Sequence, residues 1–348
     1  MKLLNDDMQK TGGDVVAKML ANENVEVVFG IIDGTYMGLI RSLERYNIQL
    51  ITPRHETSAA HMAGAYARVT GKLGVCIASN GPGVANILPG VAVEQAEGNR
   101  VLLITSCRRN QIIYPDRGGA YQYFNQTGVI GKMSKYSEHV PIPERLTEIM
   151  KQAFRISYKG RPGVVHVDIP ENYINSKSPF DIESLPKPSS YRRILPISVS
   201  DEQIKEAGDL LSKSKFPVIH AGSGVIHSNA QAELQKIAEQ LGAPVTTSWA
   251  ARGAIDENHP LAVPMTYIDF NDNVRKNADL ILTLGSRMGE TDWWGKMPNW
   301  GNPNHQKMIQ VDIDDEILGR NKPIDLAINA DVKSFSTKNY LLFRNFKY

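Results

Sequence analysis

The residue of this sequence whose type and position best suit chemistry is Glu56, in the run Arg54-His55-Glu56. An apolar strand ends at Pro53, and Glu56 falls where the next helix begins. A carboxylate there meets the positive end of the helix dipole and stabilises the helix by about 0.3–1 kcal/mol. Taken alone, Glu56 is therefore explained as a first-turn acid, although a carboxyl group is also a usual general acid or base.

One face of the helix that follows Glu56 consists of small residues. They recur at i, i+3 and i, i+4 spacing, at Ala59, Ala60, Ala63, Gly64 and Ala67. Such a face lets another helix approach very closely, either within the chain or across a subunit boundary. We expect it to support a homo-oligomer, a dimer or a tetramer.

Glycine-rich turns follow apolar strands in both halves of the chain, at Asn80-Gly81-Pro82-Gly83 and at Ala221-Gly222-Ser223-Gly224. Glycine and proline are the residues that any strand-to-helix turn requires. Such turns also let a ligand approach the backbone at the C-terminal edge of a parallel sheet. The second turn lacks the third glycine of a dinucleotide fingerprint, so it is weak evidence for NAD.

These residues are positioned by an alternation of short apolar strands with longer segments of helical period, which is typical of βαβ units in a parallel sheet. The expected strands are 25–29, 49–52, 73–78, 101–105 and 164–169, then 217–221, 244–247, 280–284 and 308–313. The expected helices are 14–21, 56–70, 84–97 and 144–158, then 201–213 and 229–241. The strands are apolar on both faces, as a sheet covered by helices on both sides requires. The fold class is therefore α/β, with two doubly wound parallel-sheet domains.

The length of 348 residues predicts about two domains. We place an N-terminal domain at 1–172, a linker at 173–200 where prolines and serines replace regular periodicity, and a Rossmann-like central domain at 201–333. Residues 334–348 form an atypical tail. Residues 107–143 are rich in Gly, Tyr, Gln and Arg, and we expect them to be long functional loops around a short helix.

Composition excludes several classes of function. Lys and Arg total 39 against 37 Asp and Glu, a net charge of +2, which is too balanced for a nucleic-acid binder. The sequence shows neither an apolar run long enough to span a membrane nor a secretory leader, so we expect a cytoplasmic protein with no membrane partner. Cys76 and Cys107 are the only cysteines, too few for a disulfide framework or a cysteine-based zinc site.

Two stretches together carry a family resemblance. Residues 54–72 place Arg-His-Glu before an Ala-rich helix that ends in Tyr-Ala-Arg-Val-Thr-Gly-Lys, and residues 79–86 read Ser-Asn-Gly-Pro-Gly-Val-Ala-Asn. They resemble the pyrimidine-binding domain of the thiamine-diphosphate-dependent enzymes, the superfamily of acetolactate synthase, pyruvate oxidase and benzoylformate decarboxylase. Further family motifs occur at 28–34, 119–122, 135–137 and 160–170, and motifs of the family's central domain occur at 236–244, 253–261, 278–287 and 311–314. The sequence departs from the family pattern at Ile32, Gly64, Ala65, Asn80 and Arg100.

The resemblance implies a function and a set of site residues. Glu56 is the catalytic residue, which binds N1′ of the aminopyrimidine of thiamine diphosphate and thereby activates the cofactor. The other implied contacts are Ile31, Pro82 and Asn86 for the cofactor and Gln122 and His55 for the substrate, with loop ordering as the alternative for His55. The implied reaction makes or breaks a C–C bond next to the carbonyl of a 2-oxo acid such as pyruvate, as in an acetolactate synthase-like carboligase or decarboxylase.

One part of the family's machinery is absent from this sequence. The family holds Mg²⁺ and the diphosphate in a pyrophosphate domain with a Gly-Asp-Gly motif, which this sequence lacks. The eight histidines show no metal-ligand spacing, so we expect no metal site here. We expect activity to need a pyrophosphate domain supplied elsewhere, such as a separate subunit. The alternatives are a truncated, inactive chain with a regulatory or assembly role, and an α/β protein that binds FAD or NAD.

Overall fold

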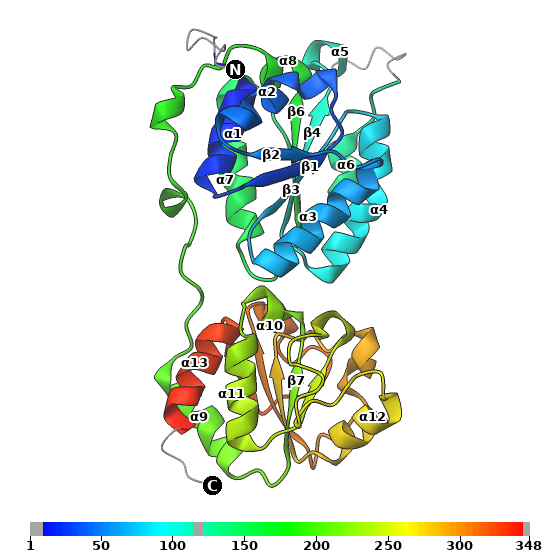
Figure 1. The fold of residues 1–348 in the computed structure, drawn as a ribbon, viewed down its shortest axis with the longest axis vertical. Helices are drawn as coiled ribbons and strands as arrows, with labels where there is room; N and C mark the ends of the chain where they lie inside the picture. The colour runs from blue at the N-terminus through cyan, green and yellow to red at the C-terminus, as the bar shows by residue number, and fades with distance from the viewer. Residues whose placement is uncertain (1–9, 114–120, 344–348) are drawn as a thin grey trace. The chain divides into compact units, whose positions relative to one another are not determined.

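The computed structural model describes residues 10–113 and 121–343 of the chain. They form two compact units that divide between Ile194 and Leu195 (Figure 1). Each unit is a parallel β-sheet with helices packed on both faces. This architecture confirms the α/β class with two doubly wound domains. Within the described residues, no helix is long and apolar enough to cross a membrane.

The sheet of the first unit has six parallel strands in the order β2-β1-β3-β4-β6-β5. In chain order the strands are β1 (Val27–Gly30), β2 (Gln49–Ile51), β3 (Gly74–Ala78), β4 (Val101–Cys107), β5 (Tyr136–His139) and β6 (Val164–Pro170). The helices are α1 (Gly12–Asn22), α2 (Met37–Arg45), α3 (Glu56–Thr70), α4 (Pro82–Glu97), α5 (Asn110–Ile113), α6 (Gln126–Ile130), α7 (Leu146–Ser157) and α8 (Glu171–Asn175). Because all strands are parallel, their carboxyl ends lie at one edge of the sheet.

Neighbouring residues of each central strand pack on opposite faces of this sheet. Val28 and Val75 join α1, α2 and α7 in one apolar core. Val27 and Cys76 join α3 and α4 in a second core on the other face. Burial on both faces explains why these strands read as continuous apolar runs in the sequence.

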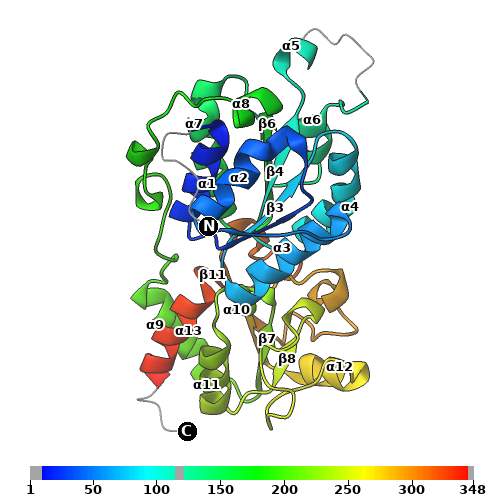
Figure 2. The same cartoon turned by 45° about the horizontal axis from the view of Figure 1, so that its top comes forward.

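Helices α3 and α4 lie side by side, and their contact uses the small-residue face of α3 (Figures 1 and 2). A Cβ added at Gly90 of α4 would lie 2.6 Å from the Cβ of Ala60. A Cβ added at Gly64 of α3 would overlap the carboxylate of Glu94. The close helix partner is therefore within the chain, so this face gives no support to a homo-oligomer.

Residues 107–143 contain more regular structure than we expected. Strand β5 forms the edge of the sheet and pairs with β6, with Tyr136 opposite Val165, and α5 and α6 precede it. The expectation of long loops around one short helix was wrong because Tyr-Ser-Glu-His has no apolar run, and an edge strand needs none. Residues 114–120, which include Gly119 and Ala120 of the Gly-Ala-Tyr-Gln motif, lie outside the described residues.

The segment 173–200, expected to be a linker, divides between the two units. Ile174, Ile182 and Tyr191 are buried in the core of the first unit. Val199 is buried in the core of the second unit. Apolar side chains at irregular spacing thus hold much of this stretch in place, although it has almost no regular secondary structure.

The sheet of the second unit has five parallel strands in the order β11-β10-β9-β7-β8. The strands are β7 (Pro217–Ala221), β8 (Val245–Thr247), β9 (Leu280–Leu284), β10 (Lys307–Asp312) and β11 (Leu326–Asn329). The helices are α9 (Asp201–Ser212), α10 (Ser223–His227), α11 (Gln231–Leu241), α12 (Ile268–Asn277) and α13 (Val332–Phe343). Helices α9, α11 and α13 cover one face of the sheet, and α12 lies on the other.

Helix α13 occupies most of the stretch expected to be an atypical tail. Val332 and Phe335, three residues apart, are buried in the same core as α9 and α11. The tail thus continues the fold of the second unit up to residue 343. The polar residues between its few apolar positions hide this helical spacing in the sequence.

Candidate functional site

The strand order of the first unit places a topological switch point between β1 and β3. From β1 the chain moves to β2 on one side, and after β3 it moves to β4 on the other side. In open α/β sheets, ligands bind outside the carboxyl ends of the strands at such a point. Ile31 directly follows β1, and the turn of residues 80–83 follows β3. The topology therefore selects the same edge that the sequence motifs indicate.

Hydrogen bonds tie the loops at this edge together. Thr35 Oγ1 donates to Asp33 Oδ1 at 2.6 Å, so it accepts from Ser106 Oγ, which also lies 2.6 Å away. Ser106 Oγ in turn accepts from the backbone N–H of Asn80 at 3.1 Å. One hydroxyl on β4 thereby fixes the loops that follow β1 and β3.

Glu56 lies in the first turn of α3, beside the start of α4. Its Oε2 accepts a hydrogen bond from Asn86 Nδ2 at 3.1 Å. Thr57 Oγ1 donates to the carbonyl of Asn86, which joins the starts of the two helices. The residue is half-buried, and within the described part of the chain no donor is bonded to Oε1 of Glu56. One carboxylate oxygen is therefore fixed, and the other is open to a ligand.

The glycine turn after β3 makes room beside this carboxylate. Gly81 has φ +67°, and a Cβ there would lie 2.5 Å from the Cα of Gln122. A Cβ at Gly83 would lie 2.6 Å from Ser79 Oγ and 3.4 Å from Glu56 Oε1. Gly81 therefore requires glycine, whereas a side chain at Gly83 would displace Ser79 Oγ and crowd the open side of the carboxylate.

Asn80 is an unpaired polar group inside this turn. Its side chain is fully buried, and neither Nδ2 nor Oδ1 has a hydrogen-bond partner within the described residues. Leaving a buried polar group unpaired costs about 1–3 kcal/mol, so such a group calls for a partner that the chain does not supply.

His55 is placed as an N-cap of α3. Its Nδ1 accepts from the backbone N–H of Thr57 at 3.2 Å, and its side chain is exposed. This contact fixes the turn that presents Glu56. The observed geometry is that of a residue that orders the loop, and its side chain is otherwise exposed.

The remaining predicted contacts lie around the same turn. The carbonyl of Ile31 accepts from the hydroxyl of Tyr36. Burial, with smaller contributions from the carboxylates of Asp33 and Glu56, raises the pKa of Tyr36, so its hydroxyl stays a donor. Pro82 is exposed in the first position of α4. The half-buried Gln122 packs its backbone against Gly81.

Gln126 is a structural part of this site that the sequence did not reveal. Its Oε1 accepts from the backbone N–H of Gly81 at 2.9 Å. Its Nε2 donates to the carbonyl of Ser106 at 3.0 Å and to Asp168 Oδ1 at 2.7 Å. This buried side chain therefore holds the glycine turn in position against β4 and β6. No motif identifies it, because its partners come from distant parts of the sequence.

The second glycine turn has a packing role of its own. In the second unit the switch point lies between β7 and β9, and each strand is followed by glycine. A Cβ at Gly222 would lie 2.2 Å from the carbonyl oxygen of Gly285, and one at Gly224 would lie 2.6 Å from its Cα. The glycines of this turn are thus explained by contact between two loops, without a dinucleotide.

Lys322 is a buried titratable group of the second unit. It is buried and donates to the carbonyls of Gly295 and Gly301 at 3.0 and 2.9 Å, beside the ring of Trp300. Burial lowers the pKa of Lys322 to about 8. In the unfolded chain the ordinary pKa of about 10.5 returns, so between these pH values the unfolded state binds more protons than the native state.

The free energy of unfolding of the second unit is therefore expected to gain a contribution that rises with pH from about 8 to about 10.5. All four tryptophans lie in this unit, so urea unfolding followed by tryptophan fluorescence measures it. Lys322→Met should remove the contribution, and Lys296→Met, at an exposed position, should keep it. The interpretation would be wrong if wild type and Lys322→Met shared the same pH profile.

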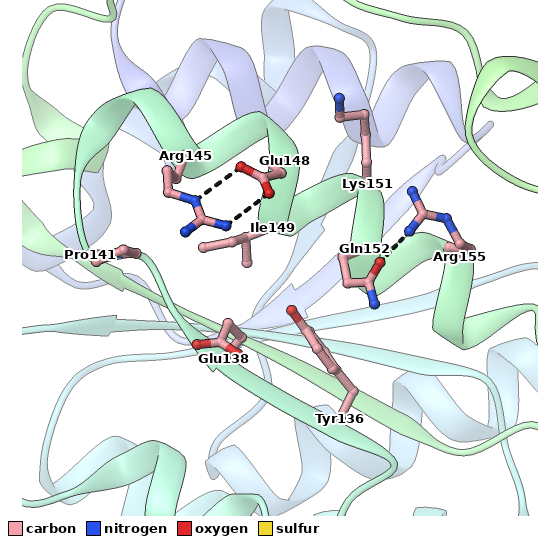
Figure 3. A pocket seen from close by; sticks show the side chains of 9 residues that line it. All are labelled: Tyr136, Glu138, Pro141, Arg145, Glu148, Ile149, Lys151, Gln152 and Arg155. Atoms are coloured by element: carbon pink, nitrogen blue, oxygen red, sulfur yellow. Dashed lines mark hydrogen bonds and ion pairs between the residues drawn. The ribbon is translucent and has the colours of Figure 1, made fainter.

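A cavity of about 480 Å³ lies elsewhere on the first unit, between the edge strand β5 and helix α7 (Figure 3). Its lining is mostly charged and polar, and Arg145 is held by Glu148 through two hydrogen bonds of 3.0 and 2.8 Å. Glu56 and the glycine turn contribute nothing to its lining. The cavity is thus separate from the site at the β1/β3 switch point.

The fold and this site define a class of protein. Residues 10–129 match the model of the N-terminal TPP binding domain of thiamine pyrophosphate enzymes, and residues 204–338 match the model of their central domain. These two matches together cover most of the chain, one in each unit. The chain belongs to the thiamine-diphosphate-dependent enzyme superfamily.

Within this superfamily, the chain is similar to acetolactate synthases and to an acetyltransferase. A probable acetolactate synthase large subunit of Methanococcus aeolicus is 32% identical over 328 residues, which are 92% of this chain and 53% of the relative. The acetolactate synthase large subunit of Cyanidium caldarium is 32% identical over 350 residues, 96% of this chain and 57% of the relative. A sulfoacetaldehyde acetyltransferase of Alcaligenes xylosoxydans xylosoxydans is 32% identical over 349 residues, 97% of this chain and 55% of the relative. The chain spans about half the length of these relatives.

Proposed function

We propose that this chain supplies the pyrimidine-binding and central domains of a thiamine-diphosphate-dependent carboligase or decarboxylase, acetolactate synthase-like, that acts on a 2-oxo acid such as pyruvate. The observation that carries the proposal is the Glu56 carboxylate, held through Oε2 by Asn86 and open at Oε1 beside Gly83. A carboxyl group fixed on one side and open on the other can hold a proton at a defined atom of a bound ring.

The residues at this edge fit the cofactor. A nitrogen of an aminopyrimidine ring can share a proton with a carboxyl group, and Oε1 of Glu56 has no bonded donor within the described residues and lies beside Gly83. Glu56 would hold the ring at N1′, Ile31 and Pro82 would line its faces, and Asn86 would keep Glu56 oriented. When bound, thiamine diphosphate supplies carbanion stabilisation for bond changes next to a carbonyl.

The finer assignments follow from this placement. His55, which caps α3 next to Glu56, and Gln122, whose backbone packs against Gly81, are proposed as substrate contacts. Mg²⁺ and the diphosphate would be held by a pyrophosphate domain, further along the polypeptide or on a partner subunit. A homo-oligomer is proposed on the family membership alone, since the small-residue face of α3 packs within the chain. A cytoplasmic location is proposed with it; the two free cysteines are consistent with a reducing compartment. We propose no FAD or NAD site, because loop packing explains the Gly222 turn.

The test of this function is to measure turnover of a 2-oxo acid when a pyrophosphate domain is supplied to the chain. Co-expression with the polypeptide encoded immediately downstream, if it carries Gly-Asp-Gly and a following Asn, is expected to give CO₂ release from pyruvate that depends on both thiamine diphosphate and Mg²⁺. The chain alone is the control and should show no turnover. A folded complex that binds thiamine diphosphate but turns over no 2-oxo acid would favour a regulatory or assembly role instead.

A further inference from the structure

A cysteine, a histidine and an aspartate meet at the carboxyl ends of three neighbouring strands of the first unit. Cys107 ends β4, His139 ends β5, and Asp168 lies near the end of β6. Their ligand atoms all lie within 4.8 Å of one another. We propose that these three residues form a site for a divalent transition-metal ion of the zinc type, separate from the proposed thiamine diphosphate site.

The distances between the ligand atoms fit tetrahedral coordination. The Sγ of Cys107 lies 3.6 Å from His139 Nδ1, and His139 Nδ1 lies 3.3 Å from Asp168 Oδ2. Zinc bonds of about 2.3 Å to sulfur and about 2.0–2.1 Å to nitrogen and oxygen, at tetrahedral angles, put sulfur about 3.6 Å from nitrogen and nitrogen about 3.4 Å from oxygen. The three side chains therefore already stand at the spacing that one ion would impose.

The histidine tautomer also suits metal binding. Asn110 Nδ2 donates to the carbonyl of Pro141 at 2.8 Å, and a carbonyl can only accept, so the amide orientation is fixed. Asn110 Oδ1 then faces His139 Nε2 at 3.1 Å and requires a proton on that nitrogen. In the neutral ring, Nδ1 keeps its lone pair. That lone pair points at a carboxylate oxygen, an arrangement that is repulsive unless a cation or a proton lies between them.

The aspartate is oriented in the same way by a second set of partners. Its Oδ1 accepts from Thr105 Oγ1 at 2.5 Å and from Gln126 Nε2 at 2.7 Å. These bonds occupy one oxygen and leave Oδ2 of Asp168 for the site. Metal-ligating histidines and carboxylates typically have such outer partners, which fix the ring and the carboxylate for coordination.

Charge and access favour a cation of this type. A thiolate, a carboxylate and a neutral imidazole carry two negative charges, which a divalent ion balances. Cys107 is buried beside the other two ligands, and a thiol that coordinates such an ion loses its proton to water. The side chain of His139 is 20% exposed, which leaves a path for the ion and for water as a fourth ligand.

The experiment uses the full chain, purified free of metal, and titrates it with Co²⁺ as a spectroscopic substitute for zinc. We expect one Co²⁺ per chain and a near-ultraviolet thiolate-to-cobalt charge-transfer band that Zn²⁺ abolishes by competition. Cys107→Ser should lose the band, and Cys76→Ala, at the other buried cysteine, should keep it. Asn110→Ala should weaken Co²⁺ binding by about 10–100-fold, because the tautomer is no longer fixed.

Two results would overturn the site. One is a wild-type chain, shown by circular dichroism to be folded, that gives no charge-transfer band at millimolar Co²⁺, which would mean that a proton and not a metal joins His139 to Asp168. The other is a band of equal strength in Cys107→Ser, which would mean an adventitious ion elsewhere. Since the readout is metal binding, failure of the proposed thiamine diphosphate chemistry would leave this test intact.

Discussion

Replacing Glu56 with glutamine is expected to slow exchange of the thiazolium C2 proton of bound thiamine diphosphate by about 100- to 10,000-fold, the usual contribution of general acid–base catalysis. Glutamine has nearly the same shape and can still accept from Asn86 Nδ2 through its carbonyl oxygen. It cannot share a proton with a ring nitrogen as a carboxyl group does. The fold should therefore be unchanged while cofactor activation is lost.

The measurement is deuterium exchange at C2, quenched in acid and read by NMR, in the holoenzyme formed with a pyrophosphate domain. Glu44→Gln is the matched control, because Glu44 is exposed on α2 and takes part in no interaction at the switch point. Exchange in Glu56→Gln within a factor of about three of the wild-type rate would show that Glu56 is only the first-turn acid of α3. Equal thermal unfolding of both variants would exclude a folding defect as the cause of any loss.

Local rules in the sequence were sufficient for the elements around this carboxylate. Helix α3 spans residues 56–70, as expected, because Gly71 takes the left-handed conformation (φ +71°) that ends a helix. The strands β3, β6 and β9 are interior strands that are buried at every position, and the apolar residues that predominate in them identify them in the sequence. Glu56 could be singled out because a strand end, a helix start and a family motif coincide there.

The contacts that depend on strand order could not be predicted from local sequence rules. Cys107, His139 and Asp168 are separated by about thirty residues at each step, and none stands at a metal-ligand spacing. They meet only because β5 and β4 flank β6. This strand order could not be predicted, because the polar sequence of the edge strand β5 did not identify it as a strand. Gln126 was not predicted for the same reason, since its three partners lie at the ends of three different strands.

Irregular segments were the other source of error in the expectations. Residues 173–200 lack periodicity, yet Tyr191 and Arg192 bind the buried carboxylate of Glu23, which directly follows α1 in the sequence. Tyr191 Oη donates to Glu23 Oε1 at 2.6 Å, and Arg192 donates through Nε and Nη2 to Glu23 Oε2 at 2.9 and 2.6 Å. Arg192 also stacks over the ring of Tyr158 at 3.7 Å. Burial and the carboxylate of Glu23 raise the pKa of Tyr191, which keeps its hydroxyl a donor.

Glu23→Ala is accordingly expected to destabilise the first unit by about 3–5 kcal/mol, because it leaves the guanidinium of Arg192 buried without its counter-charge. The side chain of Glu23 is fully buried, so water cannot replace the lost carboxylate. Amide hydrogen exchange resolved to residues 12–30 and 164–192 measures the effect, since every tryptophan lies in the second unit. Protection in α1 and in the segment around Tyr191 should fall together.

The matched control is Glu183→Ala, which breaks the exposed ion pair with Lys10 in the same segment and should cost less than about 1 kcal/mol. The double variant Glu23→Met with Arg192→Met removes both charges and should recover much of the stability, since a buried pair often costs as much in desolvation as it returns. If Glu23→Ala lowered the amide-exchange protection no more than Glu183→Ala does, the residues after Ile182 would not be packed against the first unit in solution. Equal losses in the single and double variants would instead assign the effect to lost packing, with no contribution from an unpaired charge.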